Sequence, residues 1–337
     1  MVTSNQRGND VDPTADRTVP TAERTALPDA PSRQEQDIVR RHSGGVGWAT
    51  VALCVALVAV DVTTIVCWAA GVLPIGIGFV VNSLVAYAFY TVHHDATHRA
   101  ISGRDARWRW LEVGCGLLAA FALQLDFRGY GANHLRHHAH TNGPADPDLL
   151  VKGPLWQVPL KWAFLMVLVT LGALPWGDRL VSRVLRRLVP AFAAPGSARE
   201  AADRTRLRRW TQLGLVVLTV SIPLGAFWPA LLLWYLPSRV GILILMAMFQ
   251  WLPHFPFDRT DRFGATRINR FPGSTWLLLQ QDRHLVHHLH PSIPWYRYRA
   301  AARELRPILE ANGAIIQGID THPHVPIQWR EHRSEAG

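Results

Sequence analysis

Four long apolar runs constrain this chain more than any other feature of its sequence. They cover residues 46–70, 73–92, 211–227 and 229–251, and Asp61 is the only acidic residue within them. A helix needs about 20 apolar residues to cross a bilayer core of roughly 30 Å. Short uncharged turns separate the first run from the second and the third from the fourth, so the runs pair as two hairpins. The sequence therefore predicts an all-α integral membrane protein with four transmembrane helices.

The charge distribution predicts the orientation of these helices. The formal net charge is +10, and it comes almost wholly from arginine, because lysine occurs only at 152 and 161. Such a basic chain could bind nucleic acid, but its arginines cluster between apolar runs, as they do on the cytoplasmic side of membrane proteins. We therefore expect no nucleic-acid partner. We expect both termini in the cytoplasm and the chain in the inner membrane of a bacterium.

Two further apolar segments, 111–125 and 155–176, fit a crossing less well. The first is short and must return the chain to the side it came from, which predicts a re-entrant or interfacial segment. The second is long enough to cross, but a crossing would place the arginines of 179–209 outside, against the positive-inside rule. The sequence therefore favours a membrane-associated segment that does not cross, followed by a basic interfacial stretch.

Histidines gather at three places along the chain. They stand as H-x-x-x-H in HHDATH and as H-x-x-H-H in NHLRHH and HLVHH. On a helix, residues three or four apart share one face, and imidazole binds divalent transition metals through a neutral ring nitrogen. The second histidine of each H-x-x-H-H points about 100° away from its successor, so each of these clusters can reach two ions. The eight candidate ligands are His94, His98, His134, His137, His138, His284, His287 and His288.

Eight imidazoles are too many for one ion, and four for each of two ions is a sensible division. Ligation by nitrogen without thiolate suits iron and leaves positions open for dioxygen. Because the clusters follow the ends of apolar runs, they form a histidine-rich helical cap on the cytoplasmic side. The alternatives are solvated surface histidines, a histidine-rich metal-binding or transport membrane protein, and a haem protein with two axial histidines. A zinc peptidase is disfavoured because the sequence has no H-E-x-x-H.

The three histidine boxes together resemble those of the membrane fatty acid desaturase and hydroxylase superfamily, a class of integral membrane di-iron enzymes. The resemblance covers roughly residues 47–305. It implies that the eight box histidines hold two iron ions and that dioxygen is a co-substrate. Members of the acyl desaturase branch use a further histidine about thirty residues before the last box, which implies a ninth ligand at His254, with Gln250 one helical turn earlier as a water-bridging amide. The alternative for His254 is a structural role at the end of a helix.

The resemblance completes the predicted domain organisation. Residues 1–44 are polar and lack apolar periodicity, which predicts a disordered cytoplasmic tail. Residues 45–312 are then the desaturase-like membrane domain, and residues 313–337 are a C-terminal tail.

Further polar residues lie close to the boxes. Asp95, Asp146, Asp148 and Asp282 could each orient a ligand imidazole and fix its tautomer. For Asp146 and Asp148 the alternative is turn formation around Pro147. Three more histidines adjoin the boxes. His93 could replace His94 as a ligand if the first box is read as H-x-x-x-x-H, and otherwise lies beside the ligands or on the surface, whereas His140 and His290 are near-site or structural residues.

The resemblance also implies the type of reaction. The reduced di-iron centre uses dioxygen to take hydrogen from an unactivated C–H bond. Whether hydroxylation, ketolation or desaturation follows depends on where the substrate carbon lies relative to the metal centre, to within less than an ångström. No G-x-G-x-x-G for a bound NAD or flavin is present. We therefore expect electrons from a separate donor such as a ferredoxin and its reductase, docked on the arginine-rich face.

Local likeness suggests a substrate class. The stretches HDATHR, NHLRHHAHTNGPADPD, WLPHFPFD and HLVHHLHPSIPWYRY look similar to the carotenoid ring hydroxylases and ketolases of this superfamily. The first hypothesis is therefore oxidation of a carotenoid ring. The alternative is desaturation of a fatty acyl chain, because similar stretches also occur loosely among acyl-lipid desaturases. Either substrate is a long hydrocarbon lipid that reaches the site from the bilayer, along segments 111–125 and 155–176.

Overall fold

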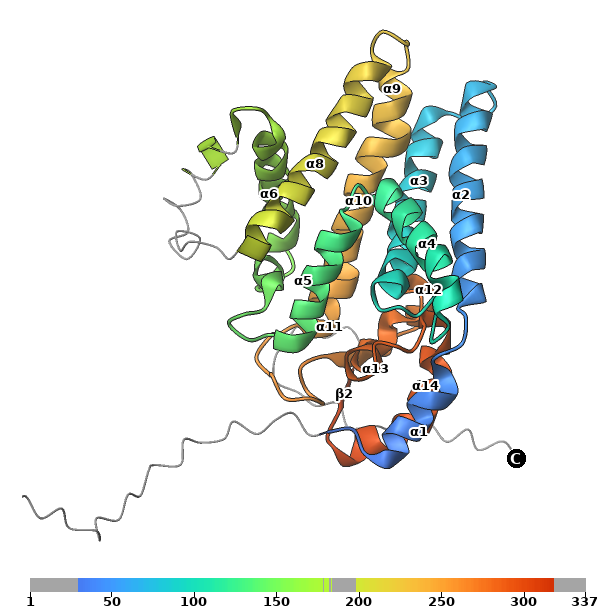
Figure 1. The fold of residues 1–337 in the computed structure, drawn as a ribbon, viewed down its shortest axis with the longest axis vertical. Helices are drawn as coiled ribbons and strands as arrows, with labels where there is room; N and C mark the ends of the chain where they lie inside the picture. The colour runs from blue at the N-terminus through green and yellow to red at the C-terminus, as the bar shows by residue number, and fades with distance from the viewer. Residues whose placement is uncertain (1–29, 178, 182, 184–197, 318–337) are drawn as a thin grey trace, which may run out of the picture.

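The computed structural model describes residues 30–177, 179–181, 183 and 198–317. Long helices lie side by side, and a cap of short helices and two short strands covers one end of them (Figure 1). Two clusters of buried hydrophobic side chains match this division, one among the long helices and one in the cap. The prediction of a mostly helical fold is confirmed. The long helices are α2 (Trp48–Ala69), α3 (Ile75–Thr97), α4 (Arg109–Leu123), α5 (Phe127–His140), α6 (Gln157–Ala173) and α8 (Ala198–Ser221), together with a continuous helical stretch over Phe227–His254.

Helices α2 and α3 form the first predicted hairpin. The chain turns between them at Gly71, whose φ of +74° is a left-handed conformation that glycine adopts without steric cost. Both helices are long and apolar enough to cross a membrane. Helix α3 packs against α2, α4 and α10, whereas α2 leaves apolar side chains such as Val55 and Val66 exposed. A helix that is apolar all round, with one face uncovered, is typical of a membrane span.

The stretch Phe227–His254 is the third helix that is long and apolar enough to cross a membrane. Its two π-helical segments each precede a proline, Pro237 or Pro253. A proline cannot donate to the carbonyl four residues earlier and clashes with it. The carbonyl of Leu233 is released in this way, and it accepts a hydrogen bond of 2.6 Å from Nδ2 of Asn82 on α3. The stretch comprises α9 (Phe227–Ala230), η4 (Leu231–Tyr235), α10 (Leu236–Leu245), η5 (Met246–Trp251) and α11 (Leu252–His254).

Helix α8 pairs with this stretch as the first arm of the second predicted hairpin. Its first half is rich in arginine, and only the part from Trp210 onward is apolar. Within the described part of the chain, three helices are therefore long and apolar enough to cross, or four if a bent pair, α4 with α5, counts as one span. Four crossings with α8 as one of them stay a prediction.

Helices α4 and α5 meet at an angle of 96°. The start of α4 lies at the start of α2, where the rings of Trp108 and Trp48 are 4.9 Å apart. The end of α5 lies at the end of α3, where the rings of His138 and His98 are also 4.9 Å apart. The start of α2 and the end of α3 are at the same end of their hairpin. The α4–α5 pair therefore enters and leaves at that end, as a re-entrant segment does.

The bend between α4 and α5 is held by a buried arginine. Nη2 of Arg239, on α10, donates to the carbonyls of Leu123 and Gln124 over 2.8 and 3.3 Å. The last carbonyls of a helix lack partners within it, and in an apolar layer they must find one elsewhere. A guanidinium at this position satisfies them and interacts favourably with the negative end of the helix dipole.

Helix α6 has 17 residues and is apolar, but it is shorter than the helices that can cross. Residues 184–197, in the middle of the predicted basic interfacial stretch, lie outside the described residues.

The cap differs from a purely helical arrangement in one respect. Strands β1 and β2 pair in parallel with Ile268 opposite Ile316, so the first residues of the predicted C-terminal tail are held in the cap. Residues 318–337 lie outside the described part. The cap comprises α1 (Arg33–His42), β1 (Arg267–Asn269), α12 (Ser274–Leu277), η6 (Gln281–Arg283), α13 (His284–Leu289), η7 (Trp295–Arg297), α14 (Tyr298–Ala311) and β2 (Ile315–Gln317); the short helices η1 (Ala106–Trp108) and η2 (Pro147–Val151) lie outside it.

Helix α1 corrects the prediction that the whole of 1–44 is disordered. Ser32 and Glu35 form a capping box at its start, in which each side chain bonds the backbone N–H of the other. Ile38 is buried in the cap core, and Arg41 pairs with Glu304 on α14. These contacts order a segment whose composition alone is that of a tail. Residues 1–29 lie outside the described part.

Candidate metal centre

Each histidine cluster reaches the centre on the end of an element that is buried elsewhere. His94 lies in the buried last turn of α3, and His98 is the residue that caps its C-terminal end. The third box lies on α13, whose six residues are too few to form a stable helix alone. Its Leu285 and Val286 are fully buried in the cap core, and this burial fixes the histidines on the opposite side of the helix.

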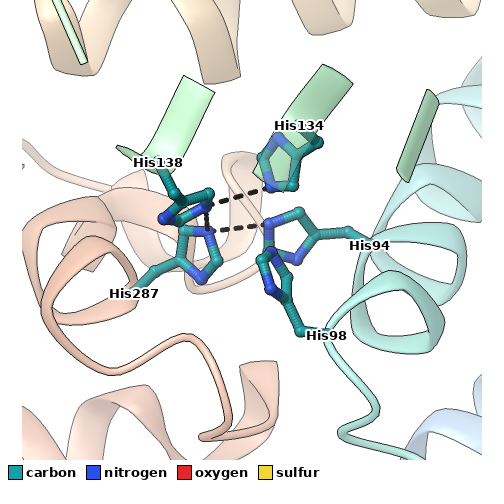
Figure 2. Close-up of side chains that lie close together, drawn as sticks. All are labelled: His94, His98, His134, His138 and His287. Carbon is teal, nitrogen blue, oxygen red and sulfur yellow. Dashed lines mark hydrogen bonds between the residues drawn. The ribbon is translucent and has the colours of Figure 1, made fainter. Parts of the chain in front are cut away.

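Five imidazoles form the first group, drawn from three separate elements. Figure 2 shows the side chains from α3, α5 and α13 converging on one point. Nε2 of His287 lies 2.8 Å from Nε2 of His138 and 3.0 Å from Nε2 of His94. One ligand atom from each of the five lies within 4.8 Å of all the others. The members are His94, His98, His134, His138 and His287.

Four imidazoles form a second group beside the first. His137, His254 and His288 offer nitrogens within 4.8 Å of one another. Nε2 of His284 lies 3.1 Å from Nε2 of both His254 and His288, so it closes the group. The second histidine of each H-x-x-H-H thus faces a different group from its successor, as the helical angle predicts. The division is five and four, because His254 joins the second group.

The contacts between these nitrogens fit metal ions better than protons. A neutral imidazole has one N–H, yet Nε2 of His287 faces two other Nε2 atoms, and the buried Nε2 of His98 has no hydrogen-bond partner among the described residues. Two nitrogens at right angles on a metal, each bonded at about 2.1 Å, lie about 3.0 Å apart. The Nε2 separations within the two groups, 2.8–3.3 Å, match that spacing. The residues present therefore fit a pair of metal sites.

The protonation states of the imidazoles also suit metal binding. Burial lowers the pKa of His98 to about 3. Burial, with the nearby His137 and His98, lowers the pKa of His284 to about 3. Burial and neighbouring imidazoles hold the pKa of His287 and His288 well below the ordinary value. At neutral pH these rings are uncharged, and each has a lone pair available for a cation.

Several Nδ1 atoms have partners that orient the rings. Oδ1 of Asp146 accepts from Nδ1 of His137 over 2.9 Å. Burial alone would raise the pKa of Asp146, but the hydrogen bonds from His137 and from the backbone of Asp148 and Asn142 outweigh it and lower the pKa, so the carboxylate is ionised. This bond fixes the tautomer that leaves Nε2 of His137 free to face the second group.

Three orienting hydroxyls were not foreseen from the sequence, and that of Tyr130 lies 3.4 Å from Nδ1 of His134. The hydroxyl of Tyr298 lies 3.0 Å from Nδ1 of His287, and that of Thr141 lies 3.3 Å from Nδ1 of His288. Thr141 follows its box directly, four residues after His137, and this position is a signal that could have been used. Tyr298 lies beyond a turn, so no helical spacing connects it to the third box.

The other predicted orienting residues are placed in different ways. Oδ2 of Asp148 lies 3.5 Å from Nδ1 of His137, and Nε2 of Gln250 donates to that oxygen over 3.3 Å, so Gln250 reaches the ligand through a carboxylate. The described hydrogen bonds of Asp95 come from Thr50 and the backbone of Trp295. Those of Asp282 come from Ser274, Thr275 and Arg283. Neither Asp95 nor Asp282 has a described bond to an imidazole.

The three adjoining histidines lie outside both groups. His93 is fully buried, and its ring packs edge-on against Phe127 and Tyr130. His140 is exposed at the end of α5. Nε2 of His290 lies 3.6 Å from Glu35 of α1, which is a structural position.

Known proteins share sequence similarity with this chain. The fatty acid desaturase family matches residues 68–319. An omega-6 fatty acid desaturase of the endoplasmic reticulum from Glycine max is 24% identical over 329 residues, which cover 89% of this chain and 82% of that protein. A beta-carotene ketolase from Paracoccus sp. (strain N81106 / MBIC 01143) is 27% identical over 220 residues, covering 63% of this chain and 73% of that protein. An acyl-lipid (9+3)-(E)-desaturase from Dimorphotheca sinuata is 23% identical over 283 residues, covering 75% and 71%.

The chain is therefore an integral membrane oxidoreductase with histidine clusters that fit a metal centre. It belongs to the fatty acid desaturase family, as the histidine boxes predict.

Proposed function

We propose that the two histidine groups hold two iron ions and that the chain uses dioxygen to oxidise a long hydrocarbon lipid. The observation that carries this proposal is the convergence of nine buried or half-buried imidazoles, without thiolate, at the ends of apolar helices. Nitrogen ligands of this kind suit iron. Bound there, two iron ions supply the dioxygen-dependent, two-electron oxidation of an unactivated C–H bond.

The ligand assignment follows the two groups. The first ion is held by the five imidazoles of the first group, and the second by the four of the second group. Tyr298, Thr141 and Asp146 hold three of these rings in the tautomer that presents Nε2. The full burial of His287 and the near-complete burial of His94 exclude bulk water from the reacting region. Since these three rings are fixed from outside, they need not reorganise during turnover.

The membrane topology completes the proposal. Four crossings, formed by α2, α3, α8 and Phe227–His254, place the cap, the metal site and both termini in the cytoplasm. The bend between α4 and α5 supports a re-entrant segment, which lies with α6 along the path of the substrate. Residues 45–312 form the membrane domain, and a bacterial inner membrane is the expected location.

For the substrate we propose a carotenoid ring, which the chain would hydroxylate or convert to a ketone. The similarity to a beta-carotene ketolase and the local likeness around His254 and the third box support this choice. A second candidate is an acyl chain of a membrane lipid. It is favoured by the longer match to an omega-6 fatty acid desaturase, which spans most of both chains.

Electrons would come from a separate donor such as a ferredoxin with its reductase. The arginines between the apolar runs are complementary to an acidic protein.

Two measurements test the proposal. Metal analysis of protein made under iron-replete conditions is expected to give about two iron ions per chain; zinc alone would contradict the assignment. Expression in a host that accumulates β-carotene, with pigments and fatty acids profiled together, separates the substrates. New polar carotenoids support the first candidate, and new acyl unsaturation supports the second.

A further inference from the structure

A cavity of about 500 Å³ lies in the cap, away from the histidine groups. Its walls come from the segment 270–276, from η6 and from α14. Three arginines line it, Arg270, Arg283 and Arg299, against one acidic residue, Asp282. All three guanidinium groups line the same cavity, so their positive charges add. We call this cavity the arginine pocket.

A second cavity, of about 270 Å³, adjoins the arginine pocket and extends its positive surface. It shares all three arginines and adds Arg303 and Arg306 from α14. Asp282 pairs with Arg283 and Glu310 pairs with Arg306, so two of the five positive charges are offset and the walls keep a net positive charge. Concentrated positive charge in a concave site favours a multiply charged or bidentate anion.

The arginine pocket lies at the level where the cap meets the apolar helices. The hydroxyl of Tyr87, inside α3, donates to the carbonyl of Leu277 on α12 over 2.8 Å. Tyr87 precedes His94 by seven residues, so α12 contacts α3 about 10 Å from the metal site, measured along the axis of α3 towards its N-terminus. The side chains of Trp276 and Leu277 are 86% and 53% exposed on that helix. The pocket thus has an apolar edge beside the membrane span and an arginine edge on the cap.

We propose that the arginine pocket binds the phosphate of an anionic phospholipid head group, with Trp276 and Leu277 against its acyl chains. Guanidinium groups match phosphate oxygens bidentately, and tryptophan favours the membrane interface. The inference rests on the proposed function for the membrane level of the cap, but it does not require iron to be bound.

Two arginines of the pocket are direct sequence neighbours of residues at the metal centre. Arg283 immediately precedes His284, and Arg299 immediately follows Tyr298, whose hydroxyl contacts His287. A phosphate that bridges η6 and α14 ties together the two segments that position the third histidine box.

The test uses the full chain in a phosphate-free neutral detergent. Binding of dioctanoyl phosphatidylglycerol is compared with that of dioctanoylglycerol, which lacks the phosphate, and with inorganic phosphate. The double variant Arg299→Gln/Arg303→Gln removes two charges from the cavity walls. The matched control is Arg297→Gln, an exposed arginine two positions from Arg299 that lines neither cavity.

We expect saturable binding of phosphatidylglycerol, about tenfold weaker in the double variant and unchanged in the control. Each charge-assisted hydrogen bond to phosphate is worth enough for such a change. Equal binding of dioctanoylglycerol, or equal affinity of the double variant, would overturn the inference. Inorganic phosphate that binds as tightly as the lipid would make this a free-phosphate site. An acidic electron-donor protein that binds wild type but not the double variant, with lipid affinity unchanged, would make the pocket a protein-docking site.

Iron content, measured on the same preparations, separates this inference from the proposed function. An iron content in the double variant equal to that of the wild type shows that the variant has folded. Lipid binding by a preparation that takes up no iron would support the phospholipid site and contradict the di-iron proposal.

Discussion

The hydroxyl of Tyr298 lies 3.0 Å from Nδ1 of His287, and it joins the first turn of α14 to α13. Both side chains are fully buried. His287 is one of two members of the first group, with His138, whose Nε2 contacts the nitrogens of two other members. A single hydroxyl therefore fixes one of the two rings at the middle of that group.

Removing this hydroxyl is expected to weaken metal binding while keeping the fold. Tyr298→Phe keeps the buried ring, so packing of α14 is preserved. Loss of such a partner typically costs about 10–100-fold in metal affinity or activity. Iron affinity, measured by competition with a chelator, and the separate effects on kcat and KM check this. Tyr296→Phe, on a half-buried neighbour, is the matched control. Unchanged iron affinity with a lowered melting temperature would mean that the hydroxyl is only structural.

Substitution of His287 itself tests the ligand assignment. His287→Ala is expected to abolish turnover and to lower the iron content from about two ions per chain towards one, because only the first group loses a member. The protein should still be recovered in the membrane fraction, since the apolar helices are untouched. His140→Ala, on the exposed end of α5, should behave as wild type. Wild-type turnover by His287→Ala would remove the assignment of the site.

The sequence shows the histidine groups because their chemistry is local. Spacing on a helix places His134 and His138 on one face and turns His137 to another, and the structure has that division. How the ligands divide between the two groups does not follow from local helical spacing alone. His254 is about thirty residues from the third box, and only the packing of the stretch Phe227–His254 against the cap decides that it faces the second group.

Other elements escape prediction for physical reasons. Strands β1 and β2 have three residues each, too few for a periodic pattern, and they form because the cap brings them together. Helix α1 follows a polar segment whose composition is that of a tail, although Ser32 and Glu35 carry the signature of a capping box. Tyr298 meets His287 only because the turn at 290–294 folds α14 back on α13.

The docking of α1 on the cap is expected to depend on pH. Burial alone would raise the pKa of Glu35, but hydrogen bonds from Arg262 and Ser32 and the charge of Arg262 outweigh it, so the pKa falls below the ordinary 4.5. A carboxyl group whose pKa is lower in the folded state than in the unfolded state stabilises the folded state at pH values above its unfolded-state pKa. That stabilisation is lost as the pH falls through the folded value. The protection factor of the α1 amides, which is the exchange rate relative to that of an unfolded chain at the same pH, should therefore be high at pH 7 and fall in acid.

A charge-removing variant checks the origin of this effect. Glu35→Gln is expected to lower the free energy of α1 docking by about 1.5–3 kcal/mol at pH 7, because Arg262 loses a charged partner. The difference from wild type should shrink in acid. Asp37→Asn, in an exposed pair with Arg40, is the control and should change little. Exchange rates in Glu35→Gln that equal wild type at pH 7 would show that the ion pair does not hold α1.

The close packing of α10 on α3 is expected to control activity from a distance. A Cβ at Gly241 would lie 2.8 Å from Cβ of Ala86 and 2.9 Å from the backbone nitrogen of Tyr87, so the helices must separate to accept one. Helix α3 carries His94 of the first group, and the helix beyond α10 ends at His254 of the second. Gly241→Leu should therefore shift the two groups relative to each other. A displacement near 1 Å can cost about 100-fold in rate, so we expect a ten- to hundredfold lower kcat and a lower melting temperature. Gly76→Ala, at a helical position with open space around it, is the matched control. If Gly241→Leu retained wild-type turnover, the spacing of these helices would not set the geometry of the metal centre.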